Sequence, residues 1–345
     1  MNKMKQYKGI WRLSIIFISF WITSCENNEV IFPDFDYTTV YFANQYPVRT
    51  IVLGDDIYDN TLDNEHKCKI YATMGGVYQN DKNIEIDVEV SNELCNNLYY
   101  SNGEEVLAMP SEYYSLASDK MFLNKQLQGG IEVQLTDAFF ADANAIKNTY
   151  VIPLVMTDVA NADSILGGLA KNDSPIRTNL ADWDVTPKDY VLYCVKYINK
   201  WHAIYLRRGT DVIKTGNIVE TVIRREASVE YDELSYCSTT SLSSVELPIN
   251  VVNANDENVT CTLLLTFDQE DNCNVSSNDN GFAVTGSGKF VIDGEKKSWG
   301  NKDRNALYLD YTINVDGKTY STKDTLVVRD RGIKPEYFSP EYIVK

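Results

Sequence analysis

Alternation of apolar and acidic residues is the feature that most constrains the fold of this chain. Isoleucine and valine alternate with glutamate and aspartate over residues 84–90, and Ile131, Val133 and Leu135 alternate with polar residues in the same way. Successive side chains of a strand point to opposite faces of a sheet, so each stretch predicts a strand with one buried and one wet face. With no pattern for a long helix beside them, these stretches predict an all-β protein.

Short strands account for most of the region between residues 37 and 170. Four further strands are predicted at Tyr37–Ala43, Arg49–Leu53, Lys67–Thr73 and Tyr150–Thr157. Pro153 indicates an edge position or a bulge in the last of these, because proline donates no ladder hydrogen bond. One or two helical turns are expected from Asp137 to Lys147, with Thr136 or Asp137 as the cap. The number and spacing of the strands favour an immunoglobulin-like sandwich over residues 37–170.

A second β domain is predicted after a linker. Residues 171–188 lack periodicity and contain two prolines, which places the domain boundary there and the C-terminal domain at residues 189–345. Asp293-Gly294 and Asp316-Gly317 each lie between strand-like runs and predict two-residue hairpins. Further strands are expected at Tyr190–Trp201, Ala203–Leu206, Ile218–Arg224, Val245–Val252, Val259–Phe267, Ala306–Ile313 and Thr325–Val328. The set predicts an antiparallel barrel of the lipocalin type or a second sandwich.

The first 25 residues have the pattern of a bacterial lipoprotein signal. Lys3, Lys5, Lys8 and Arg12 precede an apolar run from residue 13 to 21, which is short for a membrane span. Ile-Thr-Ser-Cys follows and matches a lipobox, so we expect residues 1–25 to form a lipoprotein signal peptide with lipidation at Cys25. The alternative is an uncleaved membrane helix. Residues 26–36 would then be a polar, acidic tether.

The charge balance of the mature chain excludes one class of partner. The sequence carries 32 Lys and Arg against 49 Asp and Glu, and cleavage before Cys25 removes four basic residues and no acidic one. The remaining 28 basic residues give a balance of −21, which repels nucleic acid and anionic lipid. We therefore expect no nucleic-acid partner, and an outer-membrane anchor that consists of lipid.

Metal and redox chemistry receive little support from the sequence. The six cysteines after Cys25 are widely spaced, so they form no metal-ligand cluster, and we interpret them as core thiols rather than disulfides. The acidic loop 268–281 is the one candidate for calcium, but it lacks the EF-hand register and is better interpreted as a solvated loop. We expect no cofactor and no metal.

Catalytic motifs are also missing. Only His66 and His202 could serve a serine-type triad, and the sequence contains neither Gly-x-Ser-x-Gly nor a phosphate-binding glycine loop. A glycosidase needs only two suitably spaced carboxylates, and the abundance of acidic residues leaves that alternative open. We therefore expect a protein that is not an enzyme.

Aromatic side chains are the most informative candidates for binding. Sugars stack their C–H faces on aromatic rings, and their hydroxyls bond to planar polar groups. Trp299 precedes a polar loop with Asp303 and Arg304, so these three residues are the first candidates for a glycan site. Trp201 and His202 are weaker candidates, because Trp201 lies in a strand-like run where a buried ring is the usual outcome.

The segment from residue 182 to 209 resembles the domain junction of a group of Bacteroidetes-type outer-membrane lipoproteins. The most specific match is carried by Asn199, Lys200, Trp201, His202, Tyr205, Leu206, Arg207, Arg208 and Gly209. Ala203 stands where the group is expected to have glycine. Glu26-Asn27-Asn28-Glu29 is similar to the short tag that directs such lipoproteins to the cell surface.

The resemblance implies a domain arrangement, a cellular location and a function. In this group an immunoglobulin-like domain of unknown function, also found in front of some family-18 glycosidases, precedes a β-barrel-like domain of unknown function. The genes lie in Sus-like glycan-uptake loci. The implied function is a non-catalytic cell-surface lipoprotein that binds glycans, facing the cell exterior, with importer components as further partners. An endo-acting glycosidase and a structural or adhesive β protein remain the alternatives.

Overall fold

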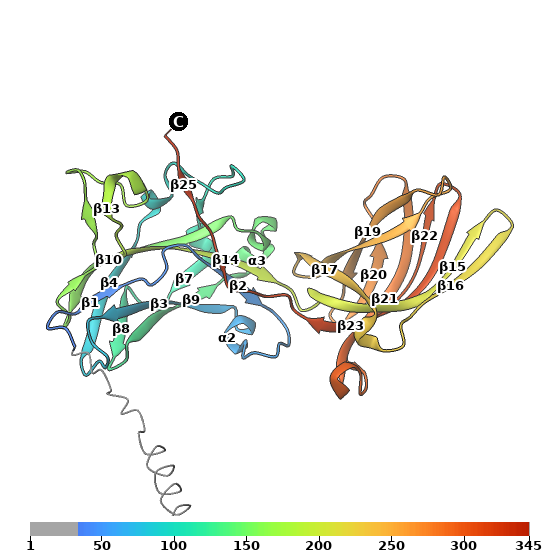
Figure 1. Ribbon diagram of the computed structural model, residues 1–345, viewed down its shortest axis with the longest axis horizontal. Coiled ribbons are helices and arrows are strands. Elements are labelled where there is room, and N and C mark those ends of the chain that lie inside the picture. Colours follow the sequence, from blue (N-terminus) through green and yellow to red (C-terminus); the bar gives the residue numbers. More distant parts are fainter. Residues whose placement is uncertain (1–33, 345) are drawn as a thin grey trace, which may run out of the picture. The chain divides into compact units, whose positions relative to one another are not determined.

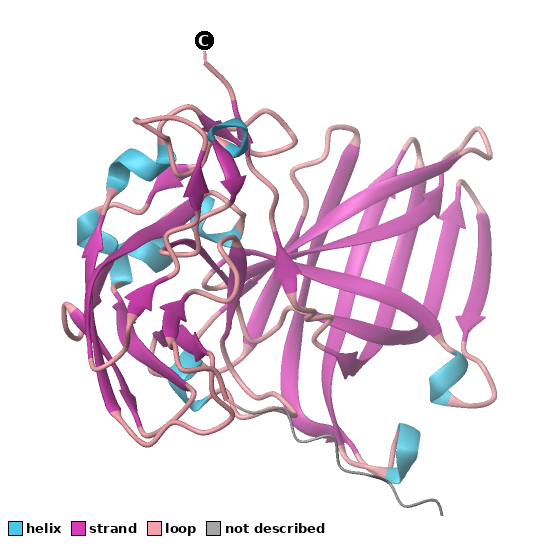
Figure 2. Cartoon of the chain, turned by 60° about the vertical axis from the view of Figure 1, so that its left-hand side comes forward, coloured by secondary structure: helices cyan, strands magenta, loops and turns pink. Residues whose placement is uncertain are grey.

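The computed structural model describes residues 34–344, and these form an all-β protein with a sandwich and a closed eight-stranded antiparallel barrel (Figures 1 and 2). Both parts belong to one compact unit that begins at Tyr37. The predicted fold class is confirmed. Lipidation at Cys25 and most of the tether lie outside the described residues. Among residues 34–344, no helix has the length and apolar character needed to cross a membrane.

The first sheet of the sandwich has five strands. Their order is β11 (Ser164–Ile165), β1 (Thr39–Tyr41), β3 (Lys67–Gly75), β9 (Gln128–Leu135) and β7 (Tyr114–Leu116). The alternation predicted between residues 131 and 135 is observed, since Ile131, Val133 and Leu135 are buried and the residues between them are partly exposed. One face of this sheet is therefore core, and the other is open to solvent.

The second sheet contains the strands with the longest apolar runs. Its order is β24 (Glu336–Tyr337), β2 (Pro47–Val52), β14 (Tyr190–Ile198), β10 (Tyr150–Ala160), β4 (Asn83–Val90) and β8 (Lys120–Asn124), and β6 (Leu107–Ala108) pairs with β10. Strands β10 and β14 are buried on both faces, because one apolar cluster fills the space between the sheets and a second covers the opposite face. This double burial explains why these two strands lack alternation.

Pro153 lies in a central strand, so the expectation of an edge position was wrong. Strand β10 has β14 on one side and β4 on the other. The carbonyl of Pro153 accepts a hydrogen bond from Ser91 N–H, which shows that its backbone faces the β4 side. Pairing with β4 begins one residue later, at Leu154, so the proline lies at the end of that ladder, where it is tolerated. The expected irregularity occurs instead between Met156 and Asp158.

Helices are short throughout the described chain. The α-helices are α2 (Thr61–Asn64) and α3 (Asp137–Ala141), and the 3-10 turns are η1 (Asn92–Cys95), η2 (Ser111–Tyr113), η3 (Ala143–Ile146), η4 (Leu180–Asp182), η5 (Val229–Tyr231) and η6 (Trp299–Asn301). α3 and η3 together confirm the one or two turns expected between Asp137 and Lys147. In α2, buried Asp63 is fixed by Arg49 and by the backbone N–H of Val52 at 2.9 Å.

The barrel follows directly after β14. Its strands run in the order β15 (Ala203–Thr215), β17 (Glu233–Ser241), β18 (Ser244–Val252), β19 (Asn258–Phe267), β20 (Asn272–Ser276), β21 (Phe282–Glu295), β22 (Arg304–Val315) and β23 (Lys318–Asp330). β15 also pairs with β23, which closes the barrel, and β16 (Ile218–Arg224) continues outward from β15 as a hairpin. The interior is filled by one apolar cluster that includes the fully buried ring of Tyr205.

A buried ion network lies against the interior cluster. Asp324, whose side chain is fully buried, accepts hydrogen bonds from Arg207 Nε at 2.9 Å and from Tyr311 at 2.8 Å, and Arg224 binds its other oxygen at 2.5 Å. Arg224 also binds Asp211 with two nitrogens. Burial alone lowers the pKa of Arg207, but Asp324 and its other partners outweigh burial and raise the pKa overall.

One predicted hairpin is confirmed and the other was wrong. Strands β22 and β23 meet at Asp316-Gly317, where both residues have positive φ, as a type I′ turn requires. Asp293-Gly294 instead lies within β21, at a register shift between Val291 and Glu295, and only Asp293 has positive φ. The chain turns later, through residues 296–303. A bulge and a hairpin use the same residue pair, so the local sequence did not separate them.

Two segments of the predicted C-terminal domain pair with the sandwich. β14 lies between β2 and β10, and after the barrel the chain returns to pair β24 with β2 and β25 (Glu341–Tyr342) with β5 (Leu98–Tyr99). Within the predicted linker, β13 (Trp183–Val185) pairs with β12 (Leu169–Ala170), which lies directly before the linker. The position at which the domains separate stays a prediction.

We expect Gly317→Ala to lower the free energy of unfolding by about 1–2 kcal/mol, because an L-residue is strained at this φ of +81° while the space around it is open. Gly167→Ala is the matched control, since its added methyl group also meets nothing and its φ is ordinary. Urea unfolding of the three proteins measures the difference. Equal stability of both variants would contradict a strained turn.

Candidate functional site

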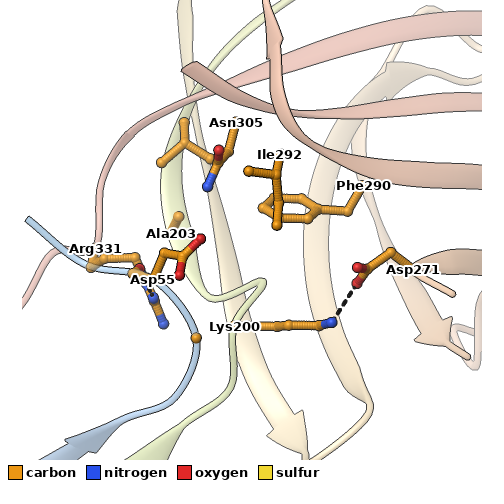
Figure 3. A pocket seen from close by; sticks show the side chains of 10 residues that line it. Asp55, Lys200, Ala203, Asp271, Phe290, Ile292, Asn305 and Arg331 are labelled. Carbon is orange, nitrogen blue, oxygen red and sulfur yellow. Dashed lines mark hydrogen bonds and ion pairs between the residues drawn. The ribbon is translucent and has the colours of Figure 1, made fainter. Parts of the chain in front are cut away.

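A small pocket combines apolar walls with polar side chains (Figure 3). Its volume is about 120 Å³, and it is lined by Gly54, Asp55, Lys200, Ala203, Asp271, Phe290, Ile292, Asn305, Val328 and Arg331. Whole small-molecule sites usually measure roughly 300–1,000 Å³. The pocket therefore has room for one end of a larger ligand rather than for the whole of it.

The turn between β14 and β15 forms one wall of the pocket, and Asn199 holds its shape. The side-chain oxygen of this buried residue accepts hydrogen bonds from the backbone N–H groups of Trp201 and His202, each at 3.1 Å. Its side-chain nitrogen donates to the carbonyls of Ser241 and Ser244, both at 2.8 Å. Every polar atom of the amide group is thus used to fix the residues that place Lys200.

Arg331 forms a second wall and joins segments that are distant in sequence. Immediately after β23, its guanidinium donates to the carbonyls of His202 at 2.7 Å, Asp55 at 2.9 Å, Leu53 at 3.1 Å and Asn199 at 2.7 Å. Burial lowers the pKa of Arg331 below its ordinary value. Four carbonyl bonds compensate for this desolvation, so we assign Arg331 a structural role and not a role in contacting a ligand.

Lys200 and Asp271 form an ion pair at 2.7 Å, which Figure 3 marks with a dashed line. The same Asp271 oxygen accepts the indole N–H of Trp201 at 3.0 Å, and Lys200 Nζ lies 4.9 Å from the centre of that ring. Trp201 itself is buried and stacks on Phe267, with ring centres 4.0 Å apart. Trp201 therefore supports the pocket from behind, and its ring is not available as a stacking surface.

Polar groups that remain available come from Asp55 and Asn305. Asp55 is exposed, and within the described chain its carboxylate has no hydrogen-bond partner. Asn305 receives the backbone N–H of Asp293 on its side-chain oxygen at 2.9 Å, which leaves its amide nitrogen as a donor. Ile292, which is 60% exposed, and Phe290 supply the apolar surface between them. An acceptor, a donor and an apolar floor thus meet in one place.

The predicted Trp299 site adjoins this pocket but is not part of its lining. The indole N–H of Trp299 donates to the carbonyl of Val328, a lining residue, at 3.1 Å. Arg304 lies 3.4 Å above the centre of the ring and covers one face. Asp303 points back into its own loop, where it binds Lys296 and the backbone N–H of Lys297. The half-buried ring has at most one face for a sugar, and its role in binding stays a prediction.

His202 is held within the fold. Its Nδ1 accepts the backbone N–H of Thr239 at 3.1 Å, and burial, reinforced by the positive charges of Arg331 and Lys196, lowers its pKa to about 4. The histidine is therefore neutral at ordinary pH and carries no charge for a ligand. Its role in glycan binding, like that of Trp201, stays a prediction.

The calcium candidate has a different local structure from the one expected. β20 occupies residues 272–276, so the stretch 268–281 is not one continuous loop. Asp268 accepts hydrogen bonds from Glu270 and Asn272 and closes a tight turn, and these bonds lower its pKa. Within residues 34–344, no group of three or more metal-binding side chains is assembled.

Several lining residues were missed by sequence reasoning. Asn305 and Ile292 lie in strands β22 and β21, where alternation predicts only which face a residue occupies. Arg331 follows the last barrel strand in a segment without any motif. The three lie on or directly after the neighbouring strands β21, β22 and β23, and barrel closure brings them to the turn at Lys200, which no local pattern predicts.

The fold and pocket define a class of protein in which a β-sandwich precedes a closed β-barrel and a small amphipathic pocket lies beside the connecting turn. Two family models match the chain. One, described as an N-terminal domain, matches residues 35–163, and a domain of unknown function, DUF5627, matches residues 200–332. None of the curated proteins matches the chain.

A crystal structure of a Bacteroides ovatus protein of unknown function is similar over nearly the whole chain. The two sequences are 45% identical, the match covers 90% of this chain and 100% of the other, and the TM-score is 0.85. The chain belongs to the same family as this Bacteroides ovatus protein.

A second solved structure, an auxiliary nutrient-binding protein from Bacteroides thetaiotaomicron, is much more distant. It is 16% identical, the match covers 81% of this chain and 90% of the other, and the TM-score is 0.36. At that TM-score the likeness supports no inference about this protein.

The low pKa of His202 makes stability depend on pH in a defined direction. The unfolded chain binds a proton at His202 near pH 6.5, and the folded chain does so only near pH 4. The contribution of neutral His202 to the free energy of unfolding is therefore complete above pH 6.5 and is lost as the pH falls toward 4. We expect wild type to lose roughly 3 kcal/mol relative to His202→Asn over this interval. Asparagine keeps an acceptor for Thr239 N–H and does not titrate.

Urea unfolding of both proteins at pH 7.5, 5.5 and 4.5 measures this change. The variant serves as the control for all other titrating groups, since they are common to both proteins. A constant difference in stability across the series would contradict the assignment.

Proposed function

We propose that this protein is a non-catalytic, lipid-anchored protein of the bacterial cell surface that binds glycans, and that the pocket beside Asn305 holds one end of the glycan. The observation that carries the proposal is the meeting of an exposed carboxylate, a side-chain amide donor and an apolar floor in that pocket. Sugars offer both hydroxyls and apolar C–H faces, so they match such a mixed surface.

The size and charge of the site narrow the class of glycan. A volume of about 120 Å³ suits the terminal unit of a chain whose remaining units extend over the rim, toward Ile292 and the Trp299 loop. The mature balance of −21 opposes the approach of polyanions. We therefore expect neutral or basic glycans.

The carboxylates of the pocket support binding more than hydrolysis. A glycosidase uses two carboxyl groups that are both directed at the scissile bond. Asp271 is occupied by Lys200 and by the indole N–H of Trp201, which leaves Asp55 as the one lining carboxylate without a partner among the described residues. In a binding site, Asp271 needs only to hold Lys200 in the wall of the pocket.

Asn305→Asp tests the pocket. Aspartate keeps the oxygen that accepts Asp293 N–H but lacks the amide donor and adds a negative charge, so we expect roughly tenfold weaker binding with little change in melting temperature. The probes are amylopectin, xylan, galactomannan and yeast mannan, each cast in native gels. Asn314→Asp, on the same strand but outside the pocket, is the control.

Binding by Asn305→Asp as strong as that of wild type would remove the pocket from the proposal. Failure of wild type to bind any of the four polysaccharides would remove glycan binding altogether.

Cys25→Ala tests the anchor. If the lipid on this cysteine holds the protein in the outer membrane, the variant is expected in soluble fractions while wild type stays with the membrane. Fractionation, combined with metabolic labelling by a radioactive fatty acid, measures both retention and acylation. Membrane retention of the variant, or a wild type without label, would defeat the proposed anchor.

A further inference from the structure

The outer face of the five-stranded sheet carries two tyrosines beside two glycines. Tyr41 on β1 and Tyr71 on β3 both point away from the sandwich core, since their neighbours Val40, Ile70 and Ala72 are the buried residues. Tyr71 is 55% exposed. Single exposed apolar side chains are common on protein surfaces, whereas neighbouring exposed rings on one face can mark a binding site.

Register places the two rings diagonally across neighbouring strands. Tyr41 is paired with Thr73, and Tyr71 is two residues from Thr73 on the same strand. In an antiparallel pair, diagonal neighbours of this kind lie roughly 7–8 Å apart. The rings are therefore close enough to contact one extended ligand.

Each of the two tyrosine rings lies beside a glycine of the same sheet, where no side chain separates the ring from the backbone. A Cβ atom on Gly130, the partner of Tyr71, would lie 2.7 Å from the carbonyl oxygen of Ile70 and 3.0 Å from the Tyr71 ring, and one on Gly75 would lie 3.4 Å from the Tyr41 ring. Each ring thus leans over bare backbone. Close approach of the β3 backbone accounts for glycine at position 130, whereas at position 75 the nearest atoms belong to the Tyr41 side chain. The two glycines leave the space next to each ring free of a side chain from positions 75 and 130.

Polar groups surround the two rings. Lys69 lies two residues before Tyr71 on the same face of β3, and Gln128 pairs with Thr73 on the side opposite Tyr41. In the part of the chain that the structure describes, neither side chain has a hydrogen-bond partner of its own. Lys188 Nζ lies over the Tyr41 ring, 5.6 Å from its centre, so a ligand that stacks on this ring also meets the ammonium group. Donors therefore stand at the rim of an aromatic surface, as a sugar ring with peripheral hydroxyls requires.

We infer that Tyr41 and Tyr71 form a second glycan-binding surface, on the sandwich and separate from the barrel pocket. It takes the same class of ligand as the proposed function, a neutral polysaccharide, but it does not depend on the pocket. Two such surfaces on one chain would strengthen the binding of long glycans, because the second contact forms at high effective concentration once the first has formed.

The first test compares variants in the same native gels with amylopectin, xylan, galactomannan and yeast mannan. Tyr41→Val and Tyr71→Val keep strand propensity and remove a ring, and each is expected to weaken binding roughly three- to tenfold. Tyr71→Phe keeps the ring and should bind nearly as wild type does. Tyr231→Val is the control, because Tyr231 is 76% exposed but lies in the barrel part of the chain.

The two sites fail separately in this experiment. If the tyrosine variants lose binding and Asn305→Asp does not, the sheet surface is supported as a binding site and the pocket is rejected. Loss in Asn305→Asp alone would overturn the inference and leave the pocket. Absence of binding by wild type to any of the four polysaccharides would overturn both.

A second measurement uses wild-type protein and does not depend on whether a variant folds. Nitration by tetranitromethane, mapped by mass spectrometry, reports the exposure of each tyrosine. A polysaccharide that retards the protein should protect Tyr41 and Tyr71 at least severalfold and leave Tyr231 unchanged. Equal nitration of Tyr41 and Tyr71 with and without that polysaccharide overturns the inference.

Discussion

Pairing of β15 with β23 is the contact on which the rest of the barrel depends. The ladder runs from Ile204 and Asp330 to Thr215 and Lys318, and it joins the first barrel strand to the last. Closure removes two sheet edges, which would otherwise expose unpaired backbone groups to other chains. It also brings Arg207 against Asp324 and delivers Arg331 to the turn that precedes β15. The pocket follows from it, because β21, β22, β23 and the turn at Lys200 meet only in the closed barrel.

Two of the sites that bury charged groups in the described chain compensate them in different ways. Arg207, Arg224, Asp211 and Asp324 compensate one another as ions, and Tyr311 adds a neutral donor. Among residues 34–344, Arg331 has no carboxylate partner, and it relies on four backbone carbonyls. Removing one member of either set would leave a buried group without its partner, which commonly costs about 3–5 kcal/mol for an ion pair. Both sets join segments far apart in sequence, so they favour one arrangement of the chain over alternatives.

The two proposed binding surfaces use aromatic and apolar groups in opposite ways. In the barrel, Trp201 lies behind the pocket and is stacked on Phe267, whereas Trp299 lies half-buried beside the pocket with one face covered by Arg304. On the sandwich, the tyrosines lie in front, over glycines that leave room for them. Trp201 lies in the turn between β14 and β15, and its ring is drawn into the core because tryptophan has a large apolar area to bury. Tyrosine on the wet face of an open sheet keeps its ring at the surface.

By itself the sequence determined the all-β class, most of the strands and the Asp316-Gly317 hairpin, because alternation and turn chemistry are local properties. It also favoured a buried ring for Trp201, although it kept this residue as a weaker binding candidate. Only the tertiary structure decided that β14 belongs to the sandwich and that Asp293-Gly294 is a bulge. It also decided that Arg331 meets the turn at Asn199, and that Asn305 and Asp55 share a pocket. Each of these depends on which strands become neighbours. Strand neighbours are chosen by the burial of whole faces and by barrel closure, to which residues more than a hundred positions apart contribute at once.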